Sequence, residues 1–79
     1  MTSQKHSMLI NLTTTVVIAH YNAAVELEFM HLWLEAQDEY ETAQSLARIN
    51  LPFDHAVNVK ITRALNKVHM AVRNKVQLP

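Results

Sequence analysis

Residues 33–47 read WLEAQDEYETAQSLA, a run of good helix formers that neither proline nor glycine interrupts. The less polar residues of this run recur at spacings of three and four, which is the pattern of a helix with one buried face. They are Trp33, Ala36, Tyr40, Ala43 and Ala47. The whole chain has no glycine, so hairpin turns that need a positive φ are disfavoured. We therefore predict an all-α protein.

A second apolar stripe with helical spacing lies upstream of this run. It consists of Leu9, Leu12, Val16, Ala19, Ala23, Leu27, Met30 and Leu34. Residues 13–18 are all β-branched, so a short strand over residues 9–17 stays open as an alternative, although a helix is favoured. Residues 28–31 contain no obligate helix breaker and fit either a turn or a continuous helix. Two or three helices are thus expected before Pro52.

A turn and a new helix are indicated around Pro52. Asn50 suits a C-cap, Pro52 cannot continue a helix, and Asp54 suits the N-cap of a last helix from about residue 55. The apolar stripe of that helix is Val57, Ile61, Leu65, Val68, Val72 and Val76. The expected layout is a disordered segment 1–6, N-terminal helices over 8–50, a turn over 51–54 and a basic helix over 55–77. The prediction is one domain, a small bundle of three or four helices.

Chain length and hydrophobicity favour assembly. A chain of 79 residues buries only about 60% of the surface that its unfolded form exposes, yet 49% of these residues are hydrophobic. We therefore expect a homodimer that completes the bundle. The chain has no cysteine for disulfides, and a cytoplasmic location is the simplest interpretation. Residues 7–25 lack Asp, Glu, Lys and Arg but contain too many other polar residues for a membrane span.

Charge is sorted along the chain although the net charge is zero. The middle of the chain is acidic, with Glu26, Glu28, Glu35, Asp38, Glu39 and Glu41. The later part is basic, with Arg48, Lys60, Arg63, Lys67, Arg73 and Lys75 against the single acid Asp54. Such sorting predicts that the acidic and basic helices pair with each other, or that each faces a different partner.

Signatures of catalysis and metal binding are lacking. The sequence has no glycine-rich phosphate loop and no cysteine nucleophile, and its acidic cluster fits the solvated side of a helix. None of the five histidines pairs with another at the i, i+4 spacing of a helical zinc site. We expect a protein that is not an enzyme and that needs neither a cofactor nor a metal.

The basic helix carries a nucleic-acid hypothesis. Lys60, Arg63 and Lys67 cluster on nearly the opposite face from its apolar stripe, where they can contact phosphates. Residues 42–48 resemble the first helix of a helix-turn-helix, and the apolar side of the last helix resembles the second. The alternatives are a solvated basic face and one that docks on the acidic helix.

One family resemblance rests on the string Ala24-Val25-Glu26-Leu27-Glu28, the step Trp33-Leu34-Glu35-Ala36, and the spaced residues Tyr40, Ala43 and Ala47. This pattern resembles the small bacterial negative regulators of AraC-type activators, and PerC-like regulators share part of it. The resemblance implies a compact helical protein that binds a transcription factor and blunts its dimerisation or DNA binding. The packing surface that it implies consists of Leu27, Trp33, Ala36, Tyr40, Ala43 and Ala47.

The expected function is regulation or inhibition through protein–protein interaction, by sequestering a larger protein. Trp33 and Tyr40 are the expected anchors, because aromatic residues dominate the binding energy of interfaces. One alternative is a DNA-binding regulator that uses Lys60, Arg63 and Lys67. Another is a phage- or plasmid-encoded inhibitor of a host protein complex.

Overall fold

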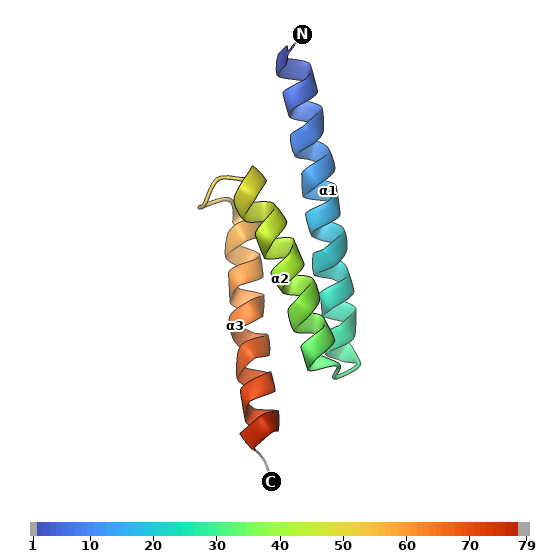
Figure 1. Ribbon diagram of the computed structural model, residues 1–79, viewed down its shortest axis with the longest axis vertical. Coiled ribbons are helices and arrows are strands. Elements are labelled where there is room, and N and C mark those ends of the chain that lie inside the picture. The colour runs from blue at the N-terminus through green and yellow to red at the C-terminus, as the bar shows by residue number, and fades with distance from the viewer. Residues whose placement is uncertain (1, 78–79) are drawn as a thin grey trace.

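The computed structural model describes residues 2–77, with side chains described for residues 12–74 (Figure 1). The described chain forms three helices and no strand: α1 (Thr2–Phe29), α2 (Trp33–Asn50) and α3 (Ala56–Gln77). The prediction of a small all-α bundle is confirmed, with two helices before Pro52 and one after it. The strand considered for residues 9–17 is not formed, and residues 2–6 begin α1 where the sequence predicted disorder.

The helix α2 is the centre of the fold. It packs antiparallel to α1 on one side and to α3 on the other, whereas α1 and α3 make almost no backbone contact with each other (Figure 1). The first part of α1 extends well beyond the end of α2. The molecule is accordingly elongated, with extents of 59 × 21 × 14 Å.

The core lies on the two sides of α2 that face its neighbours. The predicted apolar face of α2 is confirmed, because Ala36, Tyr40, Ala43 and Ala47 are fully buried. From α3 the predicted stripe contributes three buried side chains, Ile61, Leu65 and Val68, while Val76 lies outside the described side chains. Three alanines on one face of α2 let the neighbouring backbones approach closely, because a methyl group is the only side chain between them.

The predicted apolar stripe of α1 is wrong. Leu12, Val16 and Met30 are 61%, 45% and 60% exposed, and the buried residues are instead Val17 and Ala24. Residues 7–25 carry no charge on any side, so hydrophobic periodicity could not single out one face. The face that packs against α2 is the one whose polar groups find partners there, as His20 does with Glu39 at 2.7 Å.

A turn at His31 separates α1 from α2, so residues 28–31 do not continue one long helix. The amide of His31 donates to the carbonyl of Glu28, and that of Leu32 to the carbonyl of Leu27, both at 2.9 Å. This pair of bonds is a Schellman motif, whose C′ residue is left-handed and usually glycine. Here His31 takes that role with φ 60°. The glycine-free chain therefore contains one described residue that adopts a conformation which glycine would adopt at lower cost.

The second turn differs in detail from the sequence prediction. Leu51, not Asn50, is the C-cap of α2, and its amide donates to the carbonyl of Ala47 at 2.8 Å. His55, not Asp54, caps α3, because its Nδ1 accepts the amide of Val57 at 3.1 Å. The turn is held to α3 by the buried Asn58, whose Nδ2 donates to the carbonyl of Pro52 at 2.7 Å.

Candidate partner-binding groove

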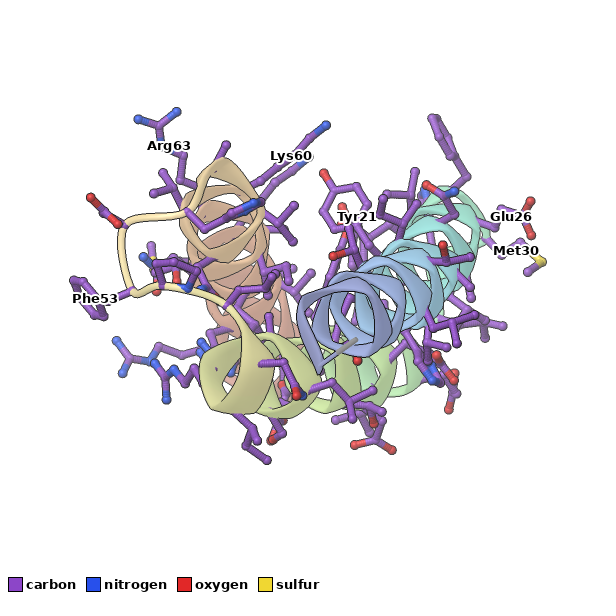
Figure 2. All side chains as sticks on the ribbon, turned by 90° about the horizontal axis from the view of Figure 1, so that it is seen from above. Tyr21, Glu26, Met30, Phe53, Lys60 and Arg63 are labelled. Atoms are coloured by element: carbon purple, nitrogen blue, oxygen red, sulfur yellow. The ribbon has the colours of Figure 1, made fainter. Side chains whose placement is uncertain are left out.

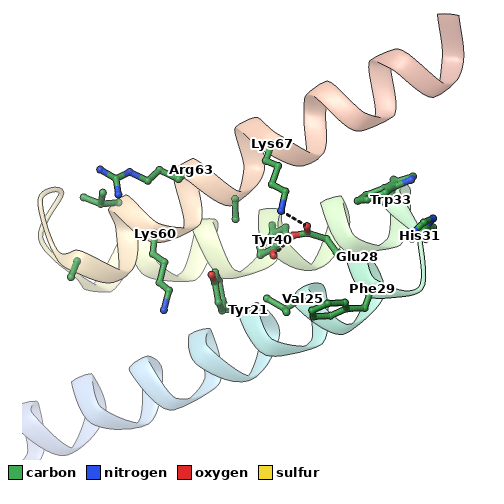
Figure 3. Close-up of a pocket in the computed structure, with 13 residues that line it drawn as sticks. Tyr21, Val25, Glu28, Phe29, His31, Trp33, Tyr40, Lys60, Arg63 and Lys67 are labelled. Carbon is green, nitrogen blue, oxygen red and sulfur yellow. Dashed lines mark hydrogen bonds and ion pairs between the residues drawn. The ribbon is translucent and has the colours of Figure 1, made fainter. Parts of the chain in front are cut away.

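An open groove of about 910 Å³ runs between α1 and α3, with α2 as its floor (Figure 3). It exists because both outer helices pack on α2 and not on each other. We call it the α1/α3 groove. The α1 wall consists of Tyr21, Val25, Glu28 and Phe29. The α3 wall consists of Ala56, Val59, Lys60, Arg63, Ala64 and Lys67, and His31, Trp33 and Tyr40 complete the lining.

Three polar residues from three helices meet in the groove. The hydroxyl of Tyr40 donates a hydrogen bond to Oε1 of Glu28, and Nζ of Lys67 lies 3.5 Å from Oε2 of the same carboxylate (Figure 3). The Glu28 side chain is only 14% exposed, so both contacts compensate a largely buried charge. Burial first, and then the hydrogen bond and negative charge of Glu28, raise the pKa of the Tyr40 phenol above its usual value.

Tyr21 of α1 contacts one residue of α2 and one residue of α3. Its ring meets that of Tyr40 edge to face, with centroids 5.5 Å apart. The Nζ of Lys60 reaches from α3 to within 5.3 Å of the centroid of the Tyr21 ring (Figure 2). A cation over an aromatic face is attractive, so this contact spans the groove where the helix backbones do not touch.

The predicted basic cluster lies on the α3 wall. Lys60, Arg63 and Lys67 stand at i, i+3 and i+7, and all three line the groove. Of these three residues, only Lys67 forms an ion pair with a carboxylate of the described chain, and its side chain remains 74% exposed. The wall therefore presents positive charge to whatever enters the groove.

The end of the groove near the first turn is aromatic. The rings of His31 and Trp33 stack with centroids 5.4 Å apart, and Trp33 is half-buried. Phe29 is 82% exposed, which is unusual for so large an apolar side chain. The sequence reasoning missed Tyr21, Val25 and Phe29. Their i, i+4, i+8 spacing was the available signal, but it lay within a helix that is apolar on several sides.

The expected packing surface does not form a single accessible surface. Ala36, Tyr40, Ala43 and Ala47 are at most 1% exposed within one chain, so they hold the bundle together and cannot receive a partner in this conformation. Trp33 does reach the groove, whereas Leu27 is half-buried and lies outside its lining. Both expected aromatic anchors line the groove, but Tyr40 is almost completely covered at its floor, and only Trp33 presents accessible surface.

Among the described residues, the expected pairing of the acidic segment with the basic helix consists of a single contact, and that contact does not involve α2. The acidic residues that form ion pairs are Glu28, which contacts Lys67, and Glu39, which contacts His20. Both pairs involve α1, and none joins α2 to α3. The charges on the outside of α2, such as Glu35 and Asp38, are exposed.

Searches for other kinds of site and for relatives give no match. Among the described residues, no three side chains of the metal-ligating types come together, and none of the described helices is long and apolar enough to span a membrane. No protein-family model matches the chain, and neither a curated protein nor a solved structure is significantly similar to it.

Proposed function

We propose that this chain is a small, non-enzymatic regulatory protein that sequesters another protein by binding one of its helices in the α1/α3 groove. The observation that carries the proposal is the groove itself, which is open along α1 and α3 and is lined by aromatic, apolar and basic side chains. Grooves with these properties receive amphipathic helices through a few apolar anchors.

The geometry of the bundle supports a helix as the ligand. A helix laid between α1 and α3 contacts both of them as well as α2, and so completes a four-helix arrangement. Its apolar side would cover Val25, Phe29 and Val59. Of these residues, Phe29 is 82% exposed and Val59 is 41% exposed.

The positive charge of the α3 wall favours a bound helix that carries carboxylates beside its apolar side. Lys60 and Arg63 have no carboxylate partner among the described residues, and Lys67 shares Glu28 with Tyr40. Carboxylates on the bound helix can pair with these cations at the rim. Such pairs add specificity and a faster association rate more than affinity.

The resemblance to the negative regulators of AraC-type activators makes a bacterial transcription factor the favoured target. On this proposal the protein works in the cytoplasm and competes for a helix that the activator needs for dimerisation. A reporter gene driven by an AraC-type activator tests this target: we expect repression by the wild-type chain and its loss in Arg63→Glu. A host protein complex is the alternative target of the same groove.

Direct DNA binding is less well supported by the arrangement of the basic residues. Lys60 and Lys67 reach into the groove toward Tyr21 and Glu28 instead of forming an outward stripe (Figure 3). To bind a phosphate backbone, Lys60 and Lys67 would have to break their contacts with Tyr21 and Glu28. Duplex DNA is therefore a further probe in the binding experiment.

The sole tryptophan of the chain makes binding directly measurable. Trp33 lines the groove, so its fluorescence emission reports on a ligand there. The probes are two synthetic amphipathic helices with the same leucine face, one flanked by glutamates and the other by lysines. We expect the glutamate peptide to bind at least about tenfold more tightly at low salt, and the difference to shrink as salt is added.

Two charge reversals on one helix provide the matched control. Arg63→Glu lies in the groove and should abolish the preference for the glutamate peptide, whereas Arg73→Glu, exposed on α3 outside the groove, should retain it. Equal binding of both peptides by the wild type would contradict the acidic-helix proposal. Tight, salt-sensitive binding of duplex DNA that Arg63→Glu abolishes, without peptide binding, would establish the DNA-binding alternative instead.

A further inference from the structure

The outer face of α1 is a second apolar surface, distinct from the groove. It consists of Leu12, Val16, Ala19 and Ala23 on the helix and of Met30, the first residue after it. At 100° per residue these positions lie within about 60° of arc. The groove-lining residues Tyr21, Val25 and Phe29 lie about 150° further around the same helix. Figure 2 shows the separation: Met30 and Glu26 point away from α3, whereas Tyr21 points toward it.

This outer face is exposed and almost free of charge. Leu12 is 61% exposed, Val16 45% and Met30 60%, and residues 7–25 contain no Asp, Glu, Lys or Arg. An uncharged apolar stripe along about 27 Å of helix, from Leu12 to Met30, is uncommon on a monomer surface. Leu12, Val16, Ala19 and Ala23 follow one another at spacings of four, three and four, as on helices that pack side by side, and Met30 lies seven residues further on.

We propose that the outer face of α1 binds the same face of a second copy, with the two α1 helices antiparallel. The sizes of the side chains fit this arrangement. A two-fold axis near position 21 places Ala19 opposite Ala23 of the second copy and Leu12 opposite its Met30. It also places Val16 opposite Glu26 of the second copy, at the edge of the face. The small residues allow close approach at the centre, and the large residues pack against each other at both ends. An interface of this kind is self-complementary, as closed dimers require.

Charge selects the antiparallel orientation. Glu26 lies at the edge of the outer face, and in a parallel pair the two Glu26 side chains would stand opposite each other. In the antiparallel pair they are about 15 Å apart along the helices, which exceeds the Debye length of about 10 Å at 0.1 M salt. Like charges directly opposed in an interface oppose association.

The amount of exposed surface fits a second copy. The chain has 5947 Å² of accessible surface, whereas a compact monomer of its 9.1 kDa has about 4,900 Å². The excess of roughly 1,000 Å² belongs to the whole elongated chain, the groove included, and is larger than the ~800 Å² that each partner of a standard interface buries. Because the groove lies on another side of α1, the dimer would carry two open grooves.

The experiment measures molar mass in solution by sedimentation equilibrium, from low to high micromolar concentration. We expect a dimer of about twice 9.1 kDa for the wild type. Ala19→Glu places two charges near the two-fold axis and should raise the dissociation constant by more than about tenfold. Ser45→Glu, the same added charge on the exposed side of α2, should leave it unchanged. A monomeric wild type, or equal effects of the two variants, would overturn the proposal.

Cysteine cross-linking tests the orientation, since the chain has no native cysteine. The double variant Leu12→Cys/Met30→Cys should give a covalent dimer under oxidation, because its two thiols meet only across the antiparallel interface. They cannot join within one chain, being about 27 Å apart along α1. Leu12→Cys alone should stay uncross-linked. Efficient cross-linking of that single variant would show a parallel pair and reject the antiparallel arrangement.

Discussion

Tyr40 of α2 donates a hydrogen bond to Glu28 of α1, and this contact fixes the two helices at the base of the groove. Glu28 in turn holds Lys67 of α3 at 3.5 Å, so one carboxylate connects all three helices. The groove and the stability of the bundle therefore depend on the same residues. A ligand carboxylate that attracts Lys67 competes with Glu28 without removing the hydrogen bond from Tyr40.

Tyr40→Phe removes this hydrogen bond while it retains the buried ring. We expect the free energy of unfolding to fall by about 1.5 kcal/mol, because Glu28 loses a donor in a site with little access to water. Urea denaturation followed by circular dichroism measures the change. Tyr21→Phe is the matched control and should cost less than Tyr40→Phe, because Tyr21 is only half-buried. Equal losses in the two variants would contradict the assigned role of the contact.

The raised pKa of Tyr40 predicts a loss of stability in alkali. The folded state holds the phenolic proton to higher pH than the unfolded state, where the pKa is about 10. The stabilisation is therefore complete below about pH 10 and declines as the pH rises toward the folded-state pKa. Urea midpoints measured between neutral pH and pH 11 should fall more steeply for the wild type than for Tyr40→Phe. Parallel curves would show that Tyr40 does not titrate as described.

His31→Gly should stabilise the protein by about 0.5–1 kcal/mol. Glycine adopts the left-handed conformation of position 31 without the steric penalty of a β-carbon. Thermal unfolding measures the gain. His31→Ala is the control, because both substitutions lose the stacking on Trp33 but only alanine keeps the β-carbon. Alanine should therefore give no gain in stability. An equal gain from both substitutions would show that the left-handed conformation of residue 31 is not the cause.

Ala43→Leu should destabilise the bundle by roughly 1–3 kcal/mol. Ala43 is fully buried on the face of α2 that packs in the core, so a larger side chain must separate the helices. Ala56→Leu, at an exposed position at the start of α3, should change the free energy of unfolding by less than about 0.5 kcal/mol. Chemical denaturation of both variants distinguishes overpacking from a general effect of adding a leucine. A neutral Ala43→Leu would mean that this interface repacks freely.

Several local features followed from the sequence because local interactions determine them. The stripe of α2 from Trp33 to Ala47 has one polar and one less polar side, so its buried face could be assigned from its period alone. The buried positions of α3 were found in the same way. Pro52 marked the break between them because a proline cannot continue a helix.

The caps and the first turn were harder to predict because neighbouring residues compete for the same role. His55 caps α3 although the adjacent Asp54 is the more common capping residue. Nothing in residues 28–31 forces a turn, and His31 adopts its positive φ only as part of the Schellman motif that joins two packed helices.

By itself the sequence determined the all-α class, the break at Pro52 and the buried faces of α2 and α3, since these depend on the periodicity of single helices. Only the tertiary structure decided which side of α1 is buried, because residues 7–25 of that helix carry no charge and its orientation depends on the partners that Glu28 and His20 find on α2. The same choice places Tyr21 and Phe29 in the groove and leaves Leu12 and Met30 exposed. Both candidate binding surfaces thus result from contacts between residues distant in the chain.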